Sequence, residues 1–341
     1  MNGGPWLSLL VPVYNVRPFV EDCLSSILYE MRDHAQVELI VLDDCSTDGS
    51  AALCRQMAQA VGPSFRFLSH SHNRGISAAR NALIDAARGR YAWFVDADDR
   101  MMAGAIDALR IIVDRHAPDL VSCDYVREGD ARFSTFDGPA QALSRCTETL
   151  VAGVFARRRL HVWSRIWKRA LFGPATRFPE GACFEDVAIV PRLLLQVGSF
   201  YHVSEPWIFY RSRPGSIMAH LARKVKLFDR QRNDELARAL VGFHHELAQG
   251  LSGVTARTQM IVARFLEREY VKISKRLLRC PQSRASLGAL RSEIGRYRRV
   301  MEDSSPISFG QVAWQYLQKG RIIRAGILGL ALAMSKRQPE H

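Results

Sequence analysis

Four consecutive residues near position 100, Asp96-Ala97-Asp98-Asp99, have the types and the spacing of a metal site, and they follow an apolar run at residues 91–95. Carboxylates that project together from the end of a buried strand repel one another, and a bound cation removes that cost. Hard oxygen ligands favour Mg²⁺ or Mn²⁺, which binds through one or two carboxylates and the phosphates of a substrate. The alternative is a set of acids at the N-terminus of a following helix, expected from about Ala103. These residues by themselves leave both interpretations open.

A second acidic pair, Glu185-Asp186, follows a glycine-containing loop and begins an apolar helical stretch at residues 187–197. A carboxylate in such a place can act as a general base and take the proton of an attacking hydroxyl group. The alternative is an acid pair that interacts favourably with the helix dipole.

Short apolar runs alternate with helical patterns over the first hundred residues, and these elements must position the acids. Strands are expected at residues 7–13, 37–42, 65–69 and 91–95. Helices are expected at residues 19–30, from a cap at Thr47 or Asp48 to about residue 60, and at residues 76–88, where Gly89 ends the helix. This alternation predicts a mostly parallel, doubly wound α/β sheet covered by helices on both faces.

Ligands of such sheets bind beyond the carboxyl ends of the strands. Polar residues follow three of the expected strands, namely Tyr14-Asn15, Asp43-Asp44 and residues 96–99. We therefore expect these three groups to converge on one ligand.

The remainder of the chain is less regular. A helix at residues 103–115 and a strand at residues 119–126 are followed by a polar stretch to about residue 145 and by mixed helix and loop. From residue 221 the pattern is helical and basic. Two domains are therefore expected, an α/β domain at residues 1–220 and a helical region at residues 221–341.

The net charge of +13 is concentrated in that helical region, where 23 Lys and Arg stand against 10 Asp and Glu. Contact with an anionic membrane surface is the favoured explanation, beside helices that simply expose basic faces to solvent. Residues 319–324 with the apolar tract 325–334 suit an interfacial helix, and the tract is too short to span a bilayer. Nucleic-acid binding is not expected, because no recognised binding module accompanies the charge.

The seven cysteines are scattered, with neither a CxxC pair nor zinc spacing, so reduced, buried thiols are expected. The N-terminal residues do not have the pattern of a signal peptide. The protein is therefore expected to be cytoplasmic.

Four segments, in this order and spacing, resemble glycosyltransferase family 2 over roughly residues 6–215: LSLLVPVYN, VELIVLDDCSTDGS, NRGISAARNALIDAARGRYAWFVDADD and FPEGACFEDVAIVPRLL. The resemblance implies the GT-A fold, inverting chemistry, a divalent metal (Mn²⁺ or Mg²⁺) and a nucleotide-sugar donor, with a preference for a UDP-sugar. It also implies a glycan or lipid-linked acceptor, as in the synthesis of exopolysaccharide, capsule or lipopolysaccharide.

The resemblance assigns site roles residue by residue. In the donor site, Asp44 corresponds to the base-binding residue, Asp96 to a ribose contact and Asp98 to the metal ligand, with Asp99 behind them. The other residues implied to line the donor site are Pro12, Tyr14, Asn15, Asp43, Arg80 and Ala97. For Arg80, an ordinary arginine on a helix surface is an equal alternative.

On the acceptor side the resemblance makes Asp186 the base and gives Glu185 an orienting role. Residues 162–168 (VWSRIWK) are similar to a stretch of one bacterial branch usually written W-N-K-L-Y, but Ser164 and Arg165 replace the commoner Asn-Lys. Arg211, Arg213 or His220 of a flexible loop would reach the diphosphate, unless that loop is a solvated basic segment.

Other functions share the α/β sheet. A nucleotidyltransferase that forms the nucleotide sugar would need a Gly-rich basic loop after the first strand, and a dinucleotide oxidoreductase would need G-x-G-x-x-G there. VPVYNVRP has neither. A non-catalytic nucleotide-sugar-binding protein is the remaining alternative if the acids have no chemical role.

Overall fold

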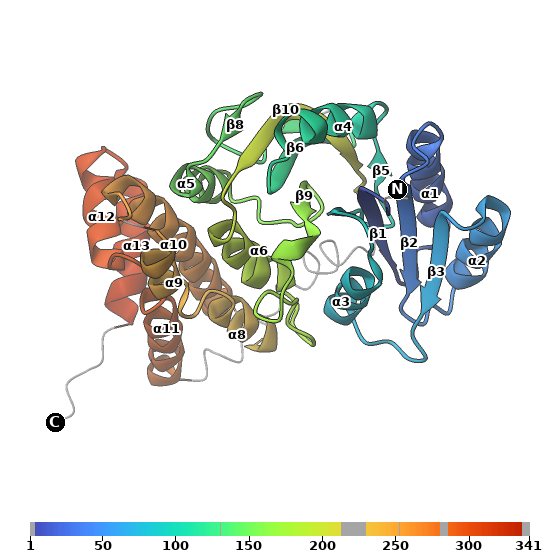
Figure 1. Cartoon of the computed structure of the whole chain (residues 1–341). Coiled ribbons are helices and arrows are strands. Elements are labelled where there is room, and N and C mark those ends of the chain that lie inside the picture. The colour runs from blue at the N-terminus through green and yellow to red at the C-terminus, as the bar shows by residue number, and fades with distance from the viewer. Residues whose placement is uncertain (1–3, 130, 213–229, 252, 280–285, 336–341) are drawn as a thin grey trace. The chain divides into compact units, whose positions relative to one another are not determined.

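The computed structural model describes residues 4–129, 131–212, 230–251, 253–279 and 286–335. The chain divides into two compact units, Met1–Ser212 and Arg213–His341. The domain boundary expected at residue 220 lies outside the described residues. In the described parts, strands occur in the first unit, whereas the second contains helices (Figure 1).

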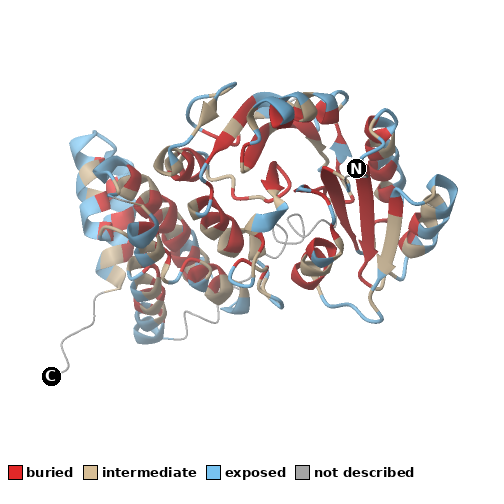
Figure 2. Cartoon of the chain, in the orientation of Figure 1, coloured by how far each residue is buried: buried red, intermediate tan, exposed pale blue. Residues whose placement is uncertain are grey.

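The first four strands are parallel and have the order β3-β2-β1-β4. They are β1 (Leu7–Val13), β2 (Val37–Asp43), β3 (Phe65–Ser69) and β4 (Tyr91–Phe94). The connecting helices are α1 (Arg17–Met31), α2 (Ser50–Val61) and α3 (Ile76–Ala86). Alternate residues of a strand point to opposite faces, so Leu7 and Leu9 pack in one core with α1, while α3 packs against β1 and β2. Both faces of this half are covered, as expected, and β1 and β2 are buried throughout (Figure 2).

Pro12 lies in a central strand, where a residue without an N–H usually costs a ladder hydrogen bond. Even-numbered residues of β1 direct their backbone polar groups toward β4, since Val95 N–H bonds to Leu10 O (3.0 Å). β4 ends at Phe94, opposite Leu10, so no β4 residue stands opposite Pro12. The proline therefore fits the end of β1 without breaking the sheet.

The sheet continues from β4 in the order β9-β6-β10-β5. The strands of this half are β5 (Arg100–Met101), β6 (Leu120–Arg127), β7 (Ala131–Phe133), β8 (Leu143–Ser144), β9 (Arg165–Lys168) and β10 (Phe200–Tyr210). β6 and β10 are parallel, whereas β9 lies antiparallel between β4 and β6. The sequence did not predict β9 or β10, and the register of β10 shifts around Pro206.

Helices α4 (Ala105–His116), α5 (Thr147–Arg157) and α6 (Glu185–Leu195) complete this unit. β5 stands between the acidic residues 96–99 and α4, and α4 has Gly104 as its N-cap. The interpretation of the acidic cluster as a helix cap is therefore wrong. The N-cap of α2 is Gly49 rather than Thr47 or Asp48, although Asp48 Oδ1 accepts the N–H of Ser50 (3.0 Å).

Gly89 does not end α3, which stops at Ala86. It is required because two segments of backbone pass close together. A Cβ atom at this position would lie 2.5 Å from the backbone nitrogen of Ser8, and the Gly89 N–H donates to Ser8 Oγ (2.8 Å).

The cysteines only partly match the expectation of buried thiols. Cys23, Cys54 and Cys123 are buried, whereas Cys146 and Cys183 are exposed. Burial raises the pKa of the Cys54 thiol to about 12, which makes it a packing residue rather than a nucleophile.

The second unit contains α8 (Arg230–Arg238), α9 (Phe243–Gly250), α10 (Ala256–Arg279), α11 (Leu287–Glu302), α12 (Phe309–Gln318) and α13 (Ile322–Met334). Helices α12 and α13 form a hairpin whose turn contains Gly320 at φ +65°. The helical character expected from residue 221 is thus confirmed in the described part. None of the helices in the described ranges is both long and apolar enough to cross a membrane.

Replacing Gly89 by Ala should destabilise the protein by about 1–3 kcal/mol, because the added methyl group overlaps the backbone of β1. Urea denaturation followed by circular dichroism measures this change. Gly173→Ala is the matched control, since its Cβ would meet nothing within 4 Å. Equal stabilities of the two variants would contradict the close approach.

Candidate active site

The carboxyl ends of β1 to β4 share one edge of the sheet, where the three polar groups converge as expected. Four buried side-chain atoms near this edge have no hydrogen-bond partner among the described residues: Asp43 Oδ1, Ser77 Oγ, Arg80 Nε and Asp99 Oδ2. Buried polar atoms are nearly always hydrogen-bonded in native proteins. Their concentration here indicates a place where a ligand supplies the missing partners.

Asp44 is buried and organises the loop that leads into α3. Its Oδ1 accepts the N–H of Arg74 (2.9 Å), and its Oδ2 accepts the N–H of Gly75 (2.7 Å). Nδ1 of His70 lies 2.7 Å from Oδ1. Gly75, at φ +85°, is the N-cap of α3. Asp44 thereby fixes where α3 begins.

The loop after β1 is tied to the loop after β2. Asn15, at φ +50°, accepts the N–H of Thr47 through Oδ1 (2.9 Å), and its own N–H donates to Ser46 Oγ (3.0 Å). Asn15 therefore holds the two loops together. Tyr14 is 49% exposed, so its ring is open to a ligand.

Asp43 and Pro12 are buried at the ends of their strands. Asp43 Oδ2 accepts the N–H of Ser46 (3.0 Å), which leaves Oδ1 as the unpartnered oxygen noted above. Of the two neighbouring carboxylates, Asp43 therefore has the oxygen that lacks a protein donor.

Arg80 is 3% exposed, so the interpretation as a surface arginine is wrong. Its guanidinium connects the two acidic groups. One terminal nitrogen lies 2.8 Å from Glu185 Oε1 and 3.0 Å from Asp186 Oδ1, and the other lies 3.2 Å from Asp96 Oδ1. The surrounding carboxylates raise the pKa of Arg80 despite its burial. The cation is therefore permanent and is shared by three acids.

The oxygens of Asp96, Asp98 and Asp99 lie within 4.8 Å of one another. Burial raises the pKa of Asp96 to about 6, with Arg80 opposing the shift and Asp98 adding to it. Burial also raises the pKa of Asp99, followed by repulsion from Asp96 and Asp98. A hard cation would offset this repulsion and would satisfy the unpartnered Asp99 Oδ2, so these residues fit a divalent metal. The Ala97 side chain is buried in the core and offers a ligand only its backbone.

Glu185 and Asp186 occupy the first turn of α6. Asp186 Oδ1 faces Arg80, and Oδ2 accepts the N–H of Val162 (3.2 Å). Burial raises the pKa of Asp186 to about 6, with Arg80 lowering it and Glu185 raising it. Burial likewise raises the pKa of Glu185. Asp186 is thus an oriented carboxylate that is more basic than a free aspartate.

Stacked rings lie beside the acids. The His161 ring stacks on Trp163 with centroids 4.1 Å apart, and Trp163 stacks on Tyr210 at 5.7 Å. His161 precedes Val162, which binds Asp186, and Tyr210 precedes Arg211, whose N–H donates to Asp99 Oδ1 (2.9 Å). The stacked rings therefore connect the segment that binds Asp186 with the segment that binds Asp99.

The basic residues expected on a flexible loop divide into two groups. The Arg211 guanidinium lies 3.1 Å from Asp22 Oδ2 and over the Phe19 ring, and its side chain is only 15% exposed. A solvated arginine is therefore the wrong interpretation for Arg211. Arg213 and His220 lie outside the described residues.

Two contributors to the site were not predicted. His70 follows β3, so the rule that placed the other polar groups at the strand ends applied to it as well. The Val162 N–H is a backbone group, and no residue type in the sequence marks it.

Comparison with known proteins finds similarity to glycosyltransferases. The model of the family described as Glycosyl transferase family 2 matches residues 8–160. The glycosyltransferase EpsJ of Bacillus subtilis is 30% identical over 221 residues, which are 62% of this chain and 63% of EpsJ. TuaG of the same organism, named as a teichuronic acid biosynthesis glycosyltransferase, is 35% identical over 99 residues, 29% of this chain and 38% of TuaG. The chain thus spans less than two thirds of either relative.

Among solved structures, that of TarS residues 1–349 from S. aureus in complex with UDP-GlcNAc aligns with a TM-score of 0.66. The alignment covers 96% of this chain and 90% of the TarS chain at 17% sequence identity. At this identity the likeness shows a common fold.

Replacing Arg80 by Met should destabilise the metal-free protein by about 3–5 kcal/mol at pH 8, because buried carboxylates lose their cation. The loss should be smaller near pH 5. The pKa of Asp186 is already raised in the folded state and rises further without Arg80. The variant therefore loses stability as the pH rises through the folded-state pKa of Asp186 in the variant. Urea denaturation in EDTA at both pH values measures the difference.

Arg177→Met is the control, since Arg177 pairs with Asp85 at the surface and its loss should cost less than about 1 kcal/mol. A loss for Arg80→Met that does not depend on pH would contradict the electrostatic role.

Proposed function

We propose that this chain, which belongs to glycosyltransferase family 2 and has the GT-A fold, is an inverting glycosyltransferase. It moves a sugar from a nucleoside-diphosphate donor to a hydroxyl group of a glycan or lipid-linked acceptor. The observation that carries the proposal is the shared guanidinium of Arg80, which holds Asp96 of the metal cluster and Asp186 of the acidic pair around one point. An enzyme of this kind needs a site for the donor phosphates and a proton acceptor close to each other.

The donor is assigned to the carboxyl edge of β1 to β4, with a UDP-sugar preferred. Asp43 Oδ1 lacks a protein donor, and the exposed Tyr14 follows the neighbouring strand β1, whose Val13 pairs with Asp43, so these groups and Asp44 are assigned to the nucleoside. Asp44 also acts indirectly, because it fixes the start of the helix that carries Arg80. Pro12 and Asn15 are assigned to shaping this pocket rather than to direct recognition.

A divalent cation, Mn²⁺ or Mg²⁺, is assigned to Asp98 and Asp96, with Asp99 contributing its unpartnered oxygen. When bound, such a cation supplies charge compensation to the leaving diphosphate. Arg80, paired with Asp96, and Arg211, whose charge lowers the pKa of Asp99, add positive charge near the cluster.

Asp186 is the proposed general base. In an inverting transfer the acceptor oxygen bonds to the anomeric carbon while the bond from that carbon to the diphosphate oxygen breaks, and the hydroxyl proton passes to Asp186. Its pKa of about 6 keeps it ionised at neutral pH and makes it a stronger base than an ordinary aspartate. Glu185, held by the same guanidinium, keeps the pair oriented.

The alternatives have less support. A nucleotidyltransferase needs a glycine-rich basic loop after β1, whereas that loop is Tyr14-Asn15 bound to Thr47. A binding protein without catalysis gives no reason for a buried, basic carboxylate at Asp186.

Asp186→Asn and Asp98→Ala should each reduce turnover of a UDP-sugar by about 10²-fold or more, because one loses the base and the other a metal ligand. The measurement is release of UDP from UDP-GlcNAc, UDP-glucose and UDP-galactose in the presence of Mn²⁺. GDP- and dTDP-sugars are tested in parallel for release of their own nucleoside diphosphates. Asp85→Asn, on the exposed side of α3, is the control. Full activity of either site variant, or in excess EDTA, would contradict the proposed mechanism.

We further propose that the product is a bacterial surface polysaccharide and that the protein works at the inner face of the plasma membrane. The hairpin of α12 and α13 supports the membrane contact. Large apolar side chains there are exposed, namely Trp314 (63%), Leu317 (48%), Ile322 (70%), Ile323 (80%) and Leu330 (61%). Arg268, Arg321 and Arg324 line the same open hollow as Ile322 and Ile323. Apolar side chains close to arginines suit an anionic lipid surface.

Ile322→Ser combined with Ile323→Ser should weaken binding to phosphatidylglycerol vesicles by roughly tenfold or more, because two apolar side chains no longer enter the membrane. Co-sedimentation at two salt concentrations measures this, and binding to phosphatidylcholine vesicles should be weak. Leu287→Ser, an exposed leucine of α11, is the control (59% exposed). Deleting residues 319–341 should have a larger effect. Unchanged binding of the double variant would rule out this surface.

A further inference from the structure

A short segment beside the proposed base, residues 159–164, is held by hydrogen bonds to its backbone as well as by buried side chains, and we name it the strap. Five of its carbonyl oxygens accept hydrogen bonds from residues of the first unit. The bonds run from Arg165 to Arg159 O (2.7 Å), His161 O (2.5 Å) and Val162 O (3.1 Å), from Trp93 Nε1 to Trp163 O (2.9 Å), and from the Cys123 N–H to Ser164 O (3.1 Å). The strap is therefore fixed in place before any ligand binds.

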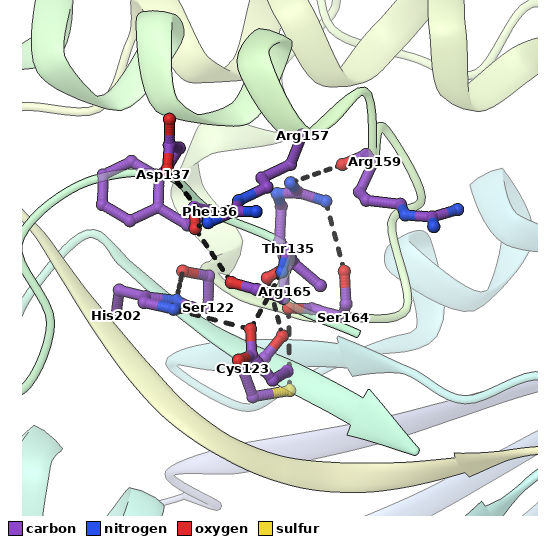
Figure 3. Close-up of polar contacts among 12 residues, drawn as sticks. Ser122, Cys123, Thr135, Phe136, Asp137, Arg157, Arg159, Ser164, Arg165 and His202 are labelled. Carbon is purple, nitrogen blue, oxygen red and sulfur yellow. Dashed lines mark hydrogen bonds and ion pairs between the residues drawn. The ribbon is translucent and has the colours of Figure 1, made fainter. Parts of the chain in front are cut away.

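Arg165 makes most of these bonds. It is the first residue of β9, its side chain is 0% exposed, and no carboxylate of the described residues lies within ion-pair distance. Its two terminal nitrogens reach different carbonyls of the strap, and one of them also lies 3.2 Å from Ser164 Oγ (Figure 3). A buried guanidinium is costly, and here it is stabilised mainly by backbone carbonyls. A planar fork with separated donors suits that geometry, whereas a lysine has a single point of donation.

The strap contacts the proposed base through one group. The Val162 N–H donates to Asp186 Oδ2, while Oδ1 is held by Arg80. Each of the two Asp186 oxygens is thus held by a different partner. Displacement of Val162 would release one oxygen and allow the carboxylate to rotate.

We propose that Arg165 is a positioning residue for the transfer reaction: its guanidinium fork sets the strap so that the Val162 N–H orients the Asp186 carboxylate. This inference rests on the proposed role of Asp186. Ser164 and Arg165, which replace the commoner Asn-Lys of the similar stretch, are fully buried and reach no solvent. Arg159 and His161 are the partly exposed residues of the strap, and the His161 ring stacks on Trp163.

The experiment compares Arg165→Met, Arg165→Lys and the milder Ser164→Ala in the full chain. UDP affinity with MnCl₂, measured by calorimetry, should stay within twofold of the parent, because the donor edge is untouched. Turnover of UDP-GlcNAc, or of whichever donor the parent uses, should fall by about tenfold or more in both Arg165 variants, since small misplacements of a reacting group cost up to about 10²-fold. The lysine variant should resemble the methionine variant.

Arg157→Met is the control. Arg157 lies in the same region (Figure 3) and also donates to a backbone carbonyl, that of Phe136 (3.3 Å), but its other partner is Asp137. Its turnover should match that of the parent. Equal turnover in Arg165→Met and Arg157→Met would overturn the inference, and so would normal turnover in Arg165→Lys, because charge alone would then suffice.

A second measurement separates this inference from the proposed function. Hydrogen exchange of the amides of residues 159–164 should accelerate in both Arg165 variants and, at Val162, in Asp186→Ala. An inactive parent enzyme would refute the proposed function, whereas unchanged exchange would refute the positioning of the strap. If Arg165→Met does not fold, Arg165→Lys and Ser164→Ala carry the same comparison.

Discussion

The site depends on one buried cation, the guanidinium of Arg80. Asp96 lies just beyond β4, and Glu185 and Asp186 open α6 about ninety residues later in the chain. Three carboxylates at this spacing would repel one another in a buried site, and burial raises the pKa of each. A guanidinium has donors in a fixed plane and stays charged, so it can hold several acids at once. The guanidinium therefore joins acids from the parallel half of the sheet to acids at the start of α6.

The position of Arg80 depends on hydrogen bonds at the start of α3. Asp44 binds the N–H groups of Arg74 and Gly75, and Gly75 begins the helix on which Arg80 lies. At the other side of the site, Arg165 holds the strap whose Val162 N–H meets Asp186. Some residues that the sequence predicts as ligand contacts are thus seen to bind other parts of the protein and to hold the site together. Asn15 and Asp44 belong to this group, whereas Asp43 and Asp99 keep an unpartnered oxygen.

The sequence predicted the part of the fold whose signals are local. β1 to β4 are short apolar runs between helical patterns, and polar residues at their ends had to converge because the strands are parallel. β9 has four residues and β5 two, which is too few for any periodicity to be detected. β10 contains Pro206 and a shifted register, so its pattern resembled a loop. The burial of Arg80 could not be predicted for a different reason: its helix looks the same whether the arginine faces solvent or carboxylates that are up to 106 residues away.

The proposed base must meet two requirements that conflict. It must be ionised at neutral pH, which a nearby cation favours, and it must remain basic enough to take a proton, which burial favours. Asp186 has both influences, since burial raises its pKa to about 6 while Arg80 opposes the rise. Its orientation is a separate matter, because Arg80 binds only Oδ1, and a carboxylate held at one oxygen can still turn. The Val162 N–H removes that freedom at Oδ2 without adding another charge. It lowers the pKa of Asp186 less than Arg80 does, so the strap can fix the direction of the base while burial, Arg80 and Glu185 remain the larger influences on its basicity.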